Sequence, residues 1–109
     1  MFKEKIFSDE SYVEILKTIQ EYSYKFIKIT DNNIPNVNKK YFLLRHDVDM
    51  SPYGAIKLGK IEAECNVVSN YFFQLNATTY QFLSSVCIDI CKELQSMGHV
   101  VGLHVDSAL

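Results

Sequence analysis

The stretch YFLLRHDVD, at positions 41–49, limits what this chain can fold into more than any other segment. Its first four residues are apolar and aromatic, which predicts a β-strand buried on both faces. In an extended backbone Asp47 and Asp49, two residues apart, leave the same face of the strand. Ser51 and Pro52 then predict a helix cap and a first helical residue. Open α/β sheets and α/β barrels build sites in this way, at the carboxyl ends of buried strands.

The rest of the chain alternates between helical and extended patterns. Apolar residues recur at helical spacing in segments 8–22, 52–66 and 80–97. Strands are predicted at 24–29, 67–75 and 99–105, besides the one that begins at residue 41. We therefore expect an α/β fold with a parallel sheet built from βαβαβ units. A closed (β/α) barrel takes about 250 residues, so the chain is expected to form the first part of a distorted barrel or a small open sheet.

Length, charge and cysteine content narrow the possible functions. A chain of 109 residues predicts a single domain. Its net charge of -2 and scattered lysines argue against nucleic acid as a partner. No apolar run reaches the length of a membrane span, and the N-terminal segment lacks the apolar core of an export signal, which together predict a cytoplasmic location. Cys65, Cys87 and Cys91 are expected to be reduced packing residues, since the count is odd and no CxxC is present.

Acidic and imidazole side chains are predicted to meet at one edge of the sheet. The strand that starts at residue 41 brings His46, Asp47 and Asp49 to this edge, and the last strand brings His104 and Asp106. Carboxylate and imidazole together suit Zn, Fe, Co, Ni or Mn. A carboxylate that does not bind the metal can take a proton from a water molecule.

Each of these residues also has a purely structural interpretation. Asp49 can cap the helix at Pro52, and His104 alone would more often be hydrogen-bonded than bound to metal. Asp106 can be a solvated strand end, and Arg45 can pair with Asp47 only to stiffen the edge. His99, directly after a glycine, is expected to be a turn residue. The metal hypothesis depends on two separate strands delivering acid and imidazole to the same place.

The motifs LRHDVD and GHVVGLHVD, in this order and spacing, resemble the polysaccharide deacetylase family (NodB homology, carbohydrate esterase family 4-like). The resemblance covers residues 12–106. It implies a distorted (β/α) barrel that uses a divalent metal, most often Zn, to hydrolyse N-acetyl or O-acetyl groups of a carbohydrate substrate. Carried over by position, Asp47 corresponds to the catalytic base, whereas Asp49 and His104 correspond to metal ligands. His46, Arg45 and Asp106 are candidate supporting residues, and His99 matches a histidine that is not a ligand.

The chain also departs from the family pattern. Val48 separates two aspartates that are adjacent in the family, and Ala108 stands where the second metal histidine is expected. Asp106 is the candidate third ligand. We therefore expect residues 1–109 to be a single, incomplete deacetylase-like domain with incomplete catalysis. The alternatives are a non-catalytic barrel fragment that binds carbohydrate or forms a homo-oligomer through its open edge, and, ranked last, phosphoryl transfer.

Overall fold

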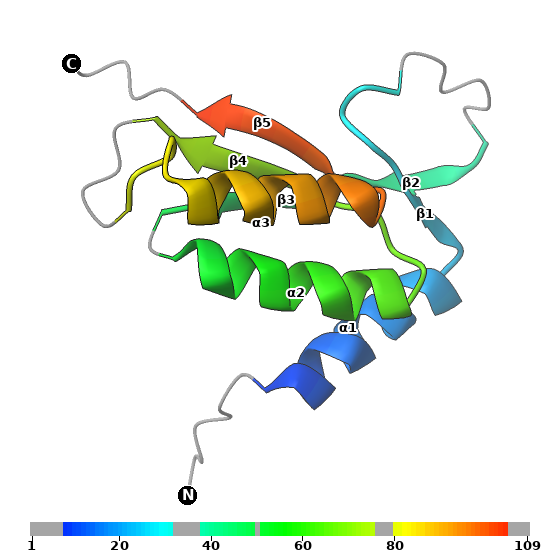
Figure 1. Ribbon diagram of the computed structural model, residues 1–109. Coiled ribbons are helices and arrows are strands. Elements are labelled where there is room, and N and C mark those ends of the chain that lie inside the picture. Colours follow the sequence, from blue (N-terminus) through cyan, green and yellow to red (C-terminus); the bar gives the residue numbers. More distant parts are fainter. Residues whose placement is uncertain (1–7, 32–37, 50, 76–79, 105–109) are drawn as a thin grey trace, which may run out of the picture.

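Three parallel strands form the central sheet of the protein. The computed structural model describes residues 8–31, 38–49, 51–75 and 80–104. The strands lie side by side in the order β3 (Arg45–Val48), β4 (Asn70–Gln74) and β5 (Val100–His104) (Figure 1). The connections are α2 (Pro52–Glu64) and α3 (Ser85–Ser96). The predicted βαβαβ order and the parallel α/β sheet are confirmed, and the described strands form open sheets with no closed barrel.

Both connecting helices cover the same face of this sheet (Figure 1). The buried apolar residues between the helices and this face are Val48, Ala55, Tyr71, Phe73, Cys87, Ile90, Cys91 and Leu94. Because side chains alternate along a strand, the residues between the core positions point the other way. We call that opposite side of the β3-β4-β5 sheet the helix-free face, since neither α2 nor α3 covers it.

A second, two-stranded sheet precedes the central one. Helix α1 (Asp9–Glu21) leads to β1 (Tyr24–Phe26), which pairs in parallel with β2 (Lys40–Phe42). The buried side chain of Asn70 joins the two sheets: its Oδ1 accepts from the Ile29 amide at 2.7 Å, and its Nδ2 donates to the Leu44 carbonyl at 3.0 Å. One amide side chain thus satisfies backbone groups where the strand ladders end.

The prediction of a strand buried on both faces at residues 41–44 is wrong. Strand β2 ends at Phe42, Leu43 is 44% exposed, and a new strand begins at Arg45. No residue of β2 is fully buried: Lys40 is exposed, and Tyr41 and Phe42 are only partly buried. The polar residues that follow can form a strand because half of them point to the helix-free face.

The third helix is shorter than the predicted segment 80–97. It starts at Ser85 because the side chain of Ser84 caps it, accepting from the Cys87 amide at 3.2 Å. Tyr80 lies before the helix, accepts a hydrogen bond from the Gln74 amide at 2.8 Å and donates to the Val48 carbonyl. Strands β1 and β4 are also shorter than the predicted segments 24–29 and 67–75.

The cysteine prediction agrees with the structure. Cys87 and Cys91 are buried on the face of α3 that packs on the sheet, and all three cysteines are free. Burial raises the pKa of the Cys91 thiol to about 12, which keeps it protonated and unreactive at neutral pH. Within the described ranges, no helix combines the length and the apolar character needed to cross a membrane.

Helices α2 and α3 pack closely at Gly59, and this contact yields a testable pair of variants. A Cβ at Gly59 would collide with the side chain of Leu94, whereas a Cβ at Gly54, in the same helix, would meet nothing within 4 Å. We expect Gly59→Ala to lower the free energy of unfolding by about 1–3 kcal/mol through overpacking.

Gly54→Ala is the matched control. It gains helix propensity without a collision and is expected to stabilise the protein by about 0.5–1 kcal/mol. Urea denaturation monitored by circular dichroism gives both values. Equal effects of the two substitutions would mean that α2 and α3 do not approach each other at Gly59.

Candidate functional site

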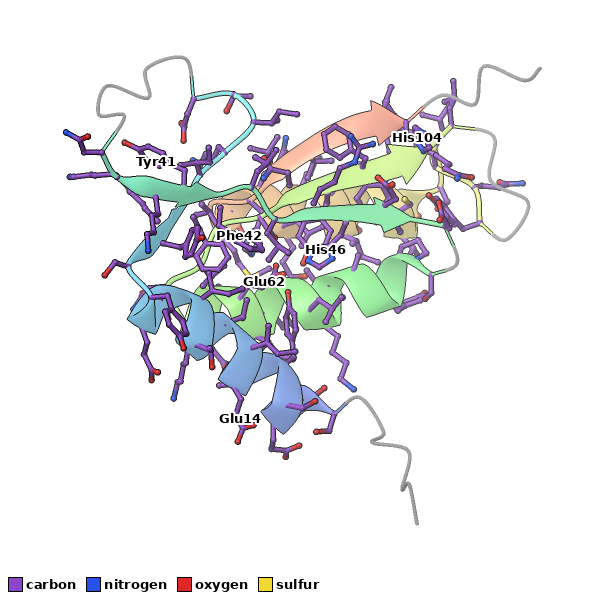
Figure 2. The ribbon with its side chains drawn as sticks, turned by 180° about the vertical axis from the view of Figure 1, so that it is seen from behind. Glu14, Tyr41, Phe42, His46, Glu62 and His104 are labelled. Atoms are coloured by element: carbon purple, nitrogen blue, oxygen red, sulfur yellow. The ribbon has the colours of Figure 1, made fainter. Side chains whose placement is uncertain are left out.

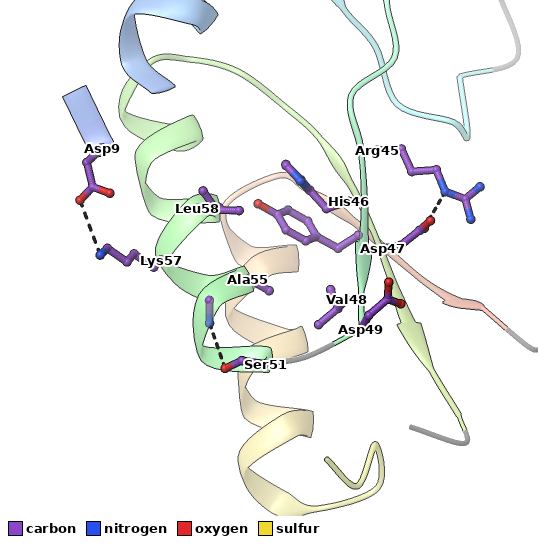
Figure 3. A pocket seen from close by; sticks show the side chains of 12 residues that line it. Asp9, Arg45, His46, Asp47, Val48, Asp49, Ser51, Ala55, Lys57 and Leu58 are labelled. Carbon is purple, nitrogen blue, oxygen red and sulfur yellow. Dashed lines mark hydrogen bonds and ion pairs between the residues drawn. The ribbon is translucent and has the colours of Figure 1, made fainter. Parts of the chain in front are cut away.

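The residues of β3 point alternately to the two faces of the sheet. Asp47 and Asp49 project to the helix-free face, as predicted from their spacing, while His46 and Val48 project toward α2 (Figure 3). Ser51, not Asp49, caps α2 by accepting from the Gly54 amide. The helix-capping alternative for Asp49 therefore does not apply.

Asp49 and His104 lie on either side of one residue of the middle strand. The side-chain amide of Gln74 donates to Asp49 Oδ1 at 2.7 Å, and Gln74 is paired in register with His104 on β5. Two strand spacings separate the outer residues, so their backbones are roughly 10 Å apart. Asp49 and His104 thus lie at the same carboxyl edge of the sheet, with Gln74 of β4 between them.

His104 has one nitrogen with no hydrogen-bond partner. Its Nδ1 is buried and is the only such side-chain atom among the described residues. A buried polar atom without a partner costs free energy, so it marks a place where a ligand or water would be favoured. This atom is the structural feature that best fits the predicted metal ligand.

The described residues do not complete a metal site by themselves. They contain no group of three His, Cys, Asp or Glu side chains that could hold one ion. Asp49 and His104 supply two donors of the types that Zn accepts. The predicted third ligand, Asp106, and the departure at Ala108 both lie outside the described residues. The metal prediction therefore stays a prediction.

Arg45 and Asp47 form an ion pair on the helix-free face. Arg45 Nε donates to Asp47 Oδ1 at 2.8 Å, and the guanidinium lies 4.2 Å from the centre of the Phe72 ring. Both charged side chains are more than 40% exposed, so the pair contributes little to stability. Its effect is to hold the Asp47 carboxylate in one orientation.

The position predicted for His46 is wrong. The sequence placed His46 beside Asp47 and Asp49, but strand alternation turns it to the opposite face (Figure 2). Its ring stacks on Tyr71, with centroids 4.7 Å apart, and its Nε2 lies 2.6 Å from Oε2 of Glu62.

Glu62 is the functional candidate that sequence reasoning missed. This side chain is fully buried, in the last turn of α2. Its Oε1 accepts from Ser69 Oγ at 2.6 Å and from the Tyr71 hydroxyl at 2.5 Å. Its Oε2 accepts from the Tyr12 hydroxyl and from His46 Nε2. The signal was present, since Glu62 follows the buried positions 55 and 59 at helical spacing and so falls on the apolar stripe.

Hydrogen bonds keep Glu62 ionised despite its burial. Burial alone would raise the pKa of this carboxyl, but donors from His46, Ser69, Tyr12 and Tyr71 outweigh it and set the pKa below its ordinary value. Burial, with the neighbouring Glu62 charge, raises the pKa of both tyrosines well above the usual range. The tyrosines therefore remain neutral donors to a negative carboxylate.

His99 is a buried structural residue and not a turn residue. Only 4% of it is exposed. Its Nδ1 accepts from the Ser69 amide at 3.1 Å, so Nε2 carries the proton and donates to the Gly59 carbonyl at 2.9 Å. Both ring nitrogens are used, which agrees with the expectation that His99 is not a metal ligand.

An open cleft of about 670 Å³ lies beside β3. Its walls are β3 itself, the first half of α2 and the start of α1, and its lining includes His46, Asp47, Tyr71 and Lys57 (Figure 3). We call it the β3–α2 cleft. Side chains from both faces of β3 line this cleft, because the cleft runs along the edge of β3 that is not paired with β4.

Comparison of the chain with protein-family models, with curated proteins and with solved structures found no match.

The Glu62 network predicts a large effect of one substitution. Glu62→Gln replaces an acceptor oxygen with an amide donor that faces hydroxyl and imidazole donors. We expect the free energy of unfolding to fall by about 2–4 kcal/mol. Glu64→Gln, at an exposed position two residues away, is the matched control and is expected to change it by less than about 0.5 kcal/mol.

The same variants have a characteristic pH dependence. Because folding lowers the pKa of Glu62 from its ordinary value of 4.5, its ionisation stabilises the protein fully above that pH and less as pH falls through the folded-state pKa. The stability gap between wild type and Glu62→Gln should therefore shrink below pH 4.5. Urea denaturation over a pH series measures it, and a gap that stays constant would show that Glu62 is not held ionised.

Proposed function

We propose that this chain is a metal-dependent hydrolase that removes acetyl groups from a carbohydrate, with a fold of the deacetylase barrel type. The proposal rests on the LRHDVD and GHVVGLHVD motifs and on one structural observation. Asp49, Gln74 and His104 lie in a row across the carboxyl ends of three parallel strands. Sites in α/β proteins form at this edge of a sheet.

Asp49 and His104 are the proposed metal ligands. The carboxylate is oriented by the Gln74 amide, and the imidazole has a buried nitrogen without a hydrogen-bond partner. This combination of oxygen and nitrogen donors suits Zn, and Co, Ni, Fe or Mn also accept it. Asp106, two residues beyond His104, is the proposed third ligand.

Asp47 is the proposed base. It projects to the same face as Asp49, and Arg45 Nε binds its Oδ1 at 2.8 Å, which leaves Oδ2 as the oxygen to accept a proton from water. A bound metal would supply polarisation of the acetyl carbonyl and a more acidic water. The exposure of Asp47 gives a substrate access to this carboxylate.

A second candidate function is assembly with another copy of the chain. Among the described residues β5 pairs only with β4, and Leu103 on β5 is half exposed. An uncovered strand edge with exposed apolar residues favours association. The homo-oligomer proposed from the sequence would use this edge.

The metal proposal predicts a thermal shift. At a Zn concentration of about 100 times Kd, binding stabilises a folded protein by about 2.7 kcal/mol, which for a chain of this size raises Tm by roughly 10 °C or more. Differential scanning fluorimetry should show this rise for wild type. Asp49→Asn and His104→Gln should lose it, while Asp89→Asn, an exposed acid on α3, should keep it.

The base is tested with the same set of proteins. Asp47→Asn should keep the Zn-dependent rise in Tm but lower acetate release from an N-acetylated chito-oligosaccharide by about 100-fold or more. No rise in Tm with any of the five metals would contradict the metal site. A Zn-dependent rise without acetate release from wild type would contradict the deacetylase activity and leave the metal site standing.

A further inference from the structure

The hydroxyl of Tyr80 binds two backbone groups at the carboxyl end of the central sheet. It accepts from the Gln74 amide at 2.8 Å and donates to the Val48 carbonyl. The β3–β4 ladder runs as far as the pair Val48 and Phe73, and from Asn70 onward every second amide of β4 points toward β3. The Gln74 amide and the Val48 carbonyl therefore belong to the last rung of this ladder. We call the two hydrogen bonds of this hydroxyl the Tyr80 bridge.

The ring of Tyr80 fixes where its hydroxyl lies. The ring packs on the core between the sheet and its helices, and its centroid lies 6.3 Å from that of Phe73, with the ring planes at 90°. Tyr80 thus reaches the rung from the face of the sheet that α2 and α3 cover. Burial raises the pKa of Tyr80, and the charge of Asp49 adds a smaller rise. The phenol therefore stays protonated at neutral pH, so that it can donate and accept at the same time.

The two backbone groups of the Tyr80 bridge set the directions of two residues of the proposed site. The Val48 carbonyl belongs to the peptide unit that leads into Asp49, and the Gln74 amide belongs to the unit that leads into Gln74. Because each peptide unit is planar, a hydrogen bond to one of its atoms restricts the orientation of the whole unit. On the helix-free face the side chains of the same two residues meet, since Gln74 Nε2 donates to Asp49 Oδ1 at 2.7 Å. The pair is thus held from both faces of the sheet.

We propose that Tyr80 is a positioning residue for Asp49. The Tyr80 bridge holds the end of β3 against the end of β4, so that the Gln74 amide meets the Asp49 carboxylate and the carboxylate keeps one orientation. The bridge follows from the hydrogen bonds alone, whereas its value for metal binding rests on the proposed function. Tyr80 lies before α3 and outside both strands. The geometry at Asp49 therefore depends on a segment that contains neither of the proposed ligands.

Tyr80→Phe tests the bridge in the metal-free protein. The substitution removes the hydroxyl and keeps the ring that packs on Phe73, so we expect the fold to remain. In 1H–15N correlation spectra the side-chain NH2 signals of Gln74 should shift, because the bond to Asp49 weakens. Hydrogen exchange of the Gln74 backbone amide should become about tenfold faster, the loss of one hydrogen bond. Tyr53→Phe, at a tyrosine that is 65% exposed, is the matched control and should change neither signal.

Zn affinity, measured by calorimetry, tests the positioning role. We expect Tyr80→Phe to raise the Kd for Zn about tenfold, which corresponds to the loss of one hydrogen bond. Gly59→Ala separates this effect from a general loss of stability. It overpacks the contact between α2 and α3, so it should lower Tm but change the Kd by less than about twofold.

The wild-type protein supplies a further check that needs no variant. A Tyr80 hydroxyl proton held in the bridge should exchange slowly with water and give a nuclear Overhauser effect to the Gln74 amide proton. A freely exchanging Tyr80 hydroxyl, unchanged Gln74 side-chain signals in Tyr80→Phe, or equal effects of Tyr80→Phe and Gly59→Ala on the Kd would overturn the proposal. If wild type binds no metal while the Gln74 signals respond to Tyr80→Phe, the proposed function loses its metal site and the positioning of Asp49 by Tyr80 is still supported.

Discussion

A single buried carboxylate links the first two helices of this protein to two strands of the central sheet. Glu62 on α2 accepts hydrogen bonds from α1 through Tyr12, from β3 through His46, from β4 through Tyr71, and from Ser69 just before β4. An ionised group without partners would be very costly in the interior. With both oxygens doubly hydrogen-bonded, the same charge instead fixes the relative positions of two helices and two strands.

The position of β3 follows from this network. His46 must point toward α2 to reach Glu62, and strand geometry then sends Asp47 and Asp49 to the opposite face. The proposed base and metal ligand are therefore placed on the helix-free face by an interaction on the other side of the strand. His104 reaches the same edge because β5 is in register with β4 at Gln74. The Glu62 network and the proposed site therefore both follow from the alternation of side chains along β3.

The sequence predicted the parts of the fold that depend on local patterns. The order of elements after Pro52, the buried side of α3 with Cys87 and Cys91, and the shared face of Asp47 and Asp49 all follow from periods of 3.6 and 2. It did not predict the break at Leu43, because burial of that segment depends on which layers surround it. Apolar periodicity alone extends the predicted third helix back to residue 80, whereas the Ser84 cap starts α3 at Ser85.

Only those parts of the candidate site that depend on local periodicity could be predicted from the sequence. Periodicity could place Asp49 and His104 at one edge of the sheet. It could not show that His46 contacts Glu62 of α2 and Tyr71 of β4. A glutamate on an apolar stripe is recognisable in sequence, yet its partners Tyr12 and Tyr71 are 50 and 9 residues away. Such a network is set by tertiary contacts and is visible only once α1, α2 and the sheet are packed.

The central functional claim is that the acids of β3 and the imidazole of β5 bind one metal ion. Anomalous diffraction at the zinc absorption edge, from crystals grown with Zn, tests it most directly. We expect a single strong peak at coordination distance, roughly 2.0–2.2 Å, from both the Asp49 carboxylate and a ring nitrogen of His104. A peak bound by neither residue, or a crystal containing Zn with no ordered peak at this edge of the sheet, would contradict the claim.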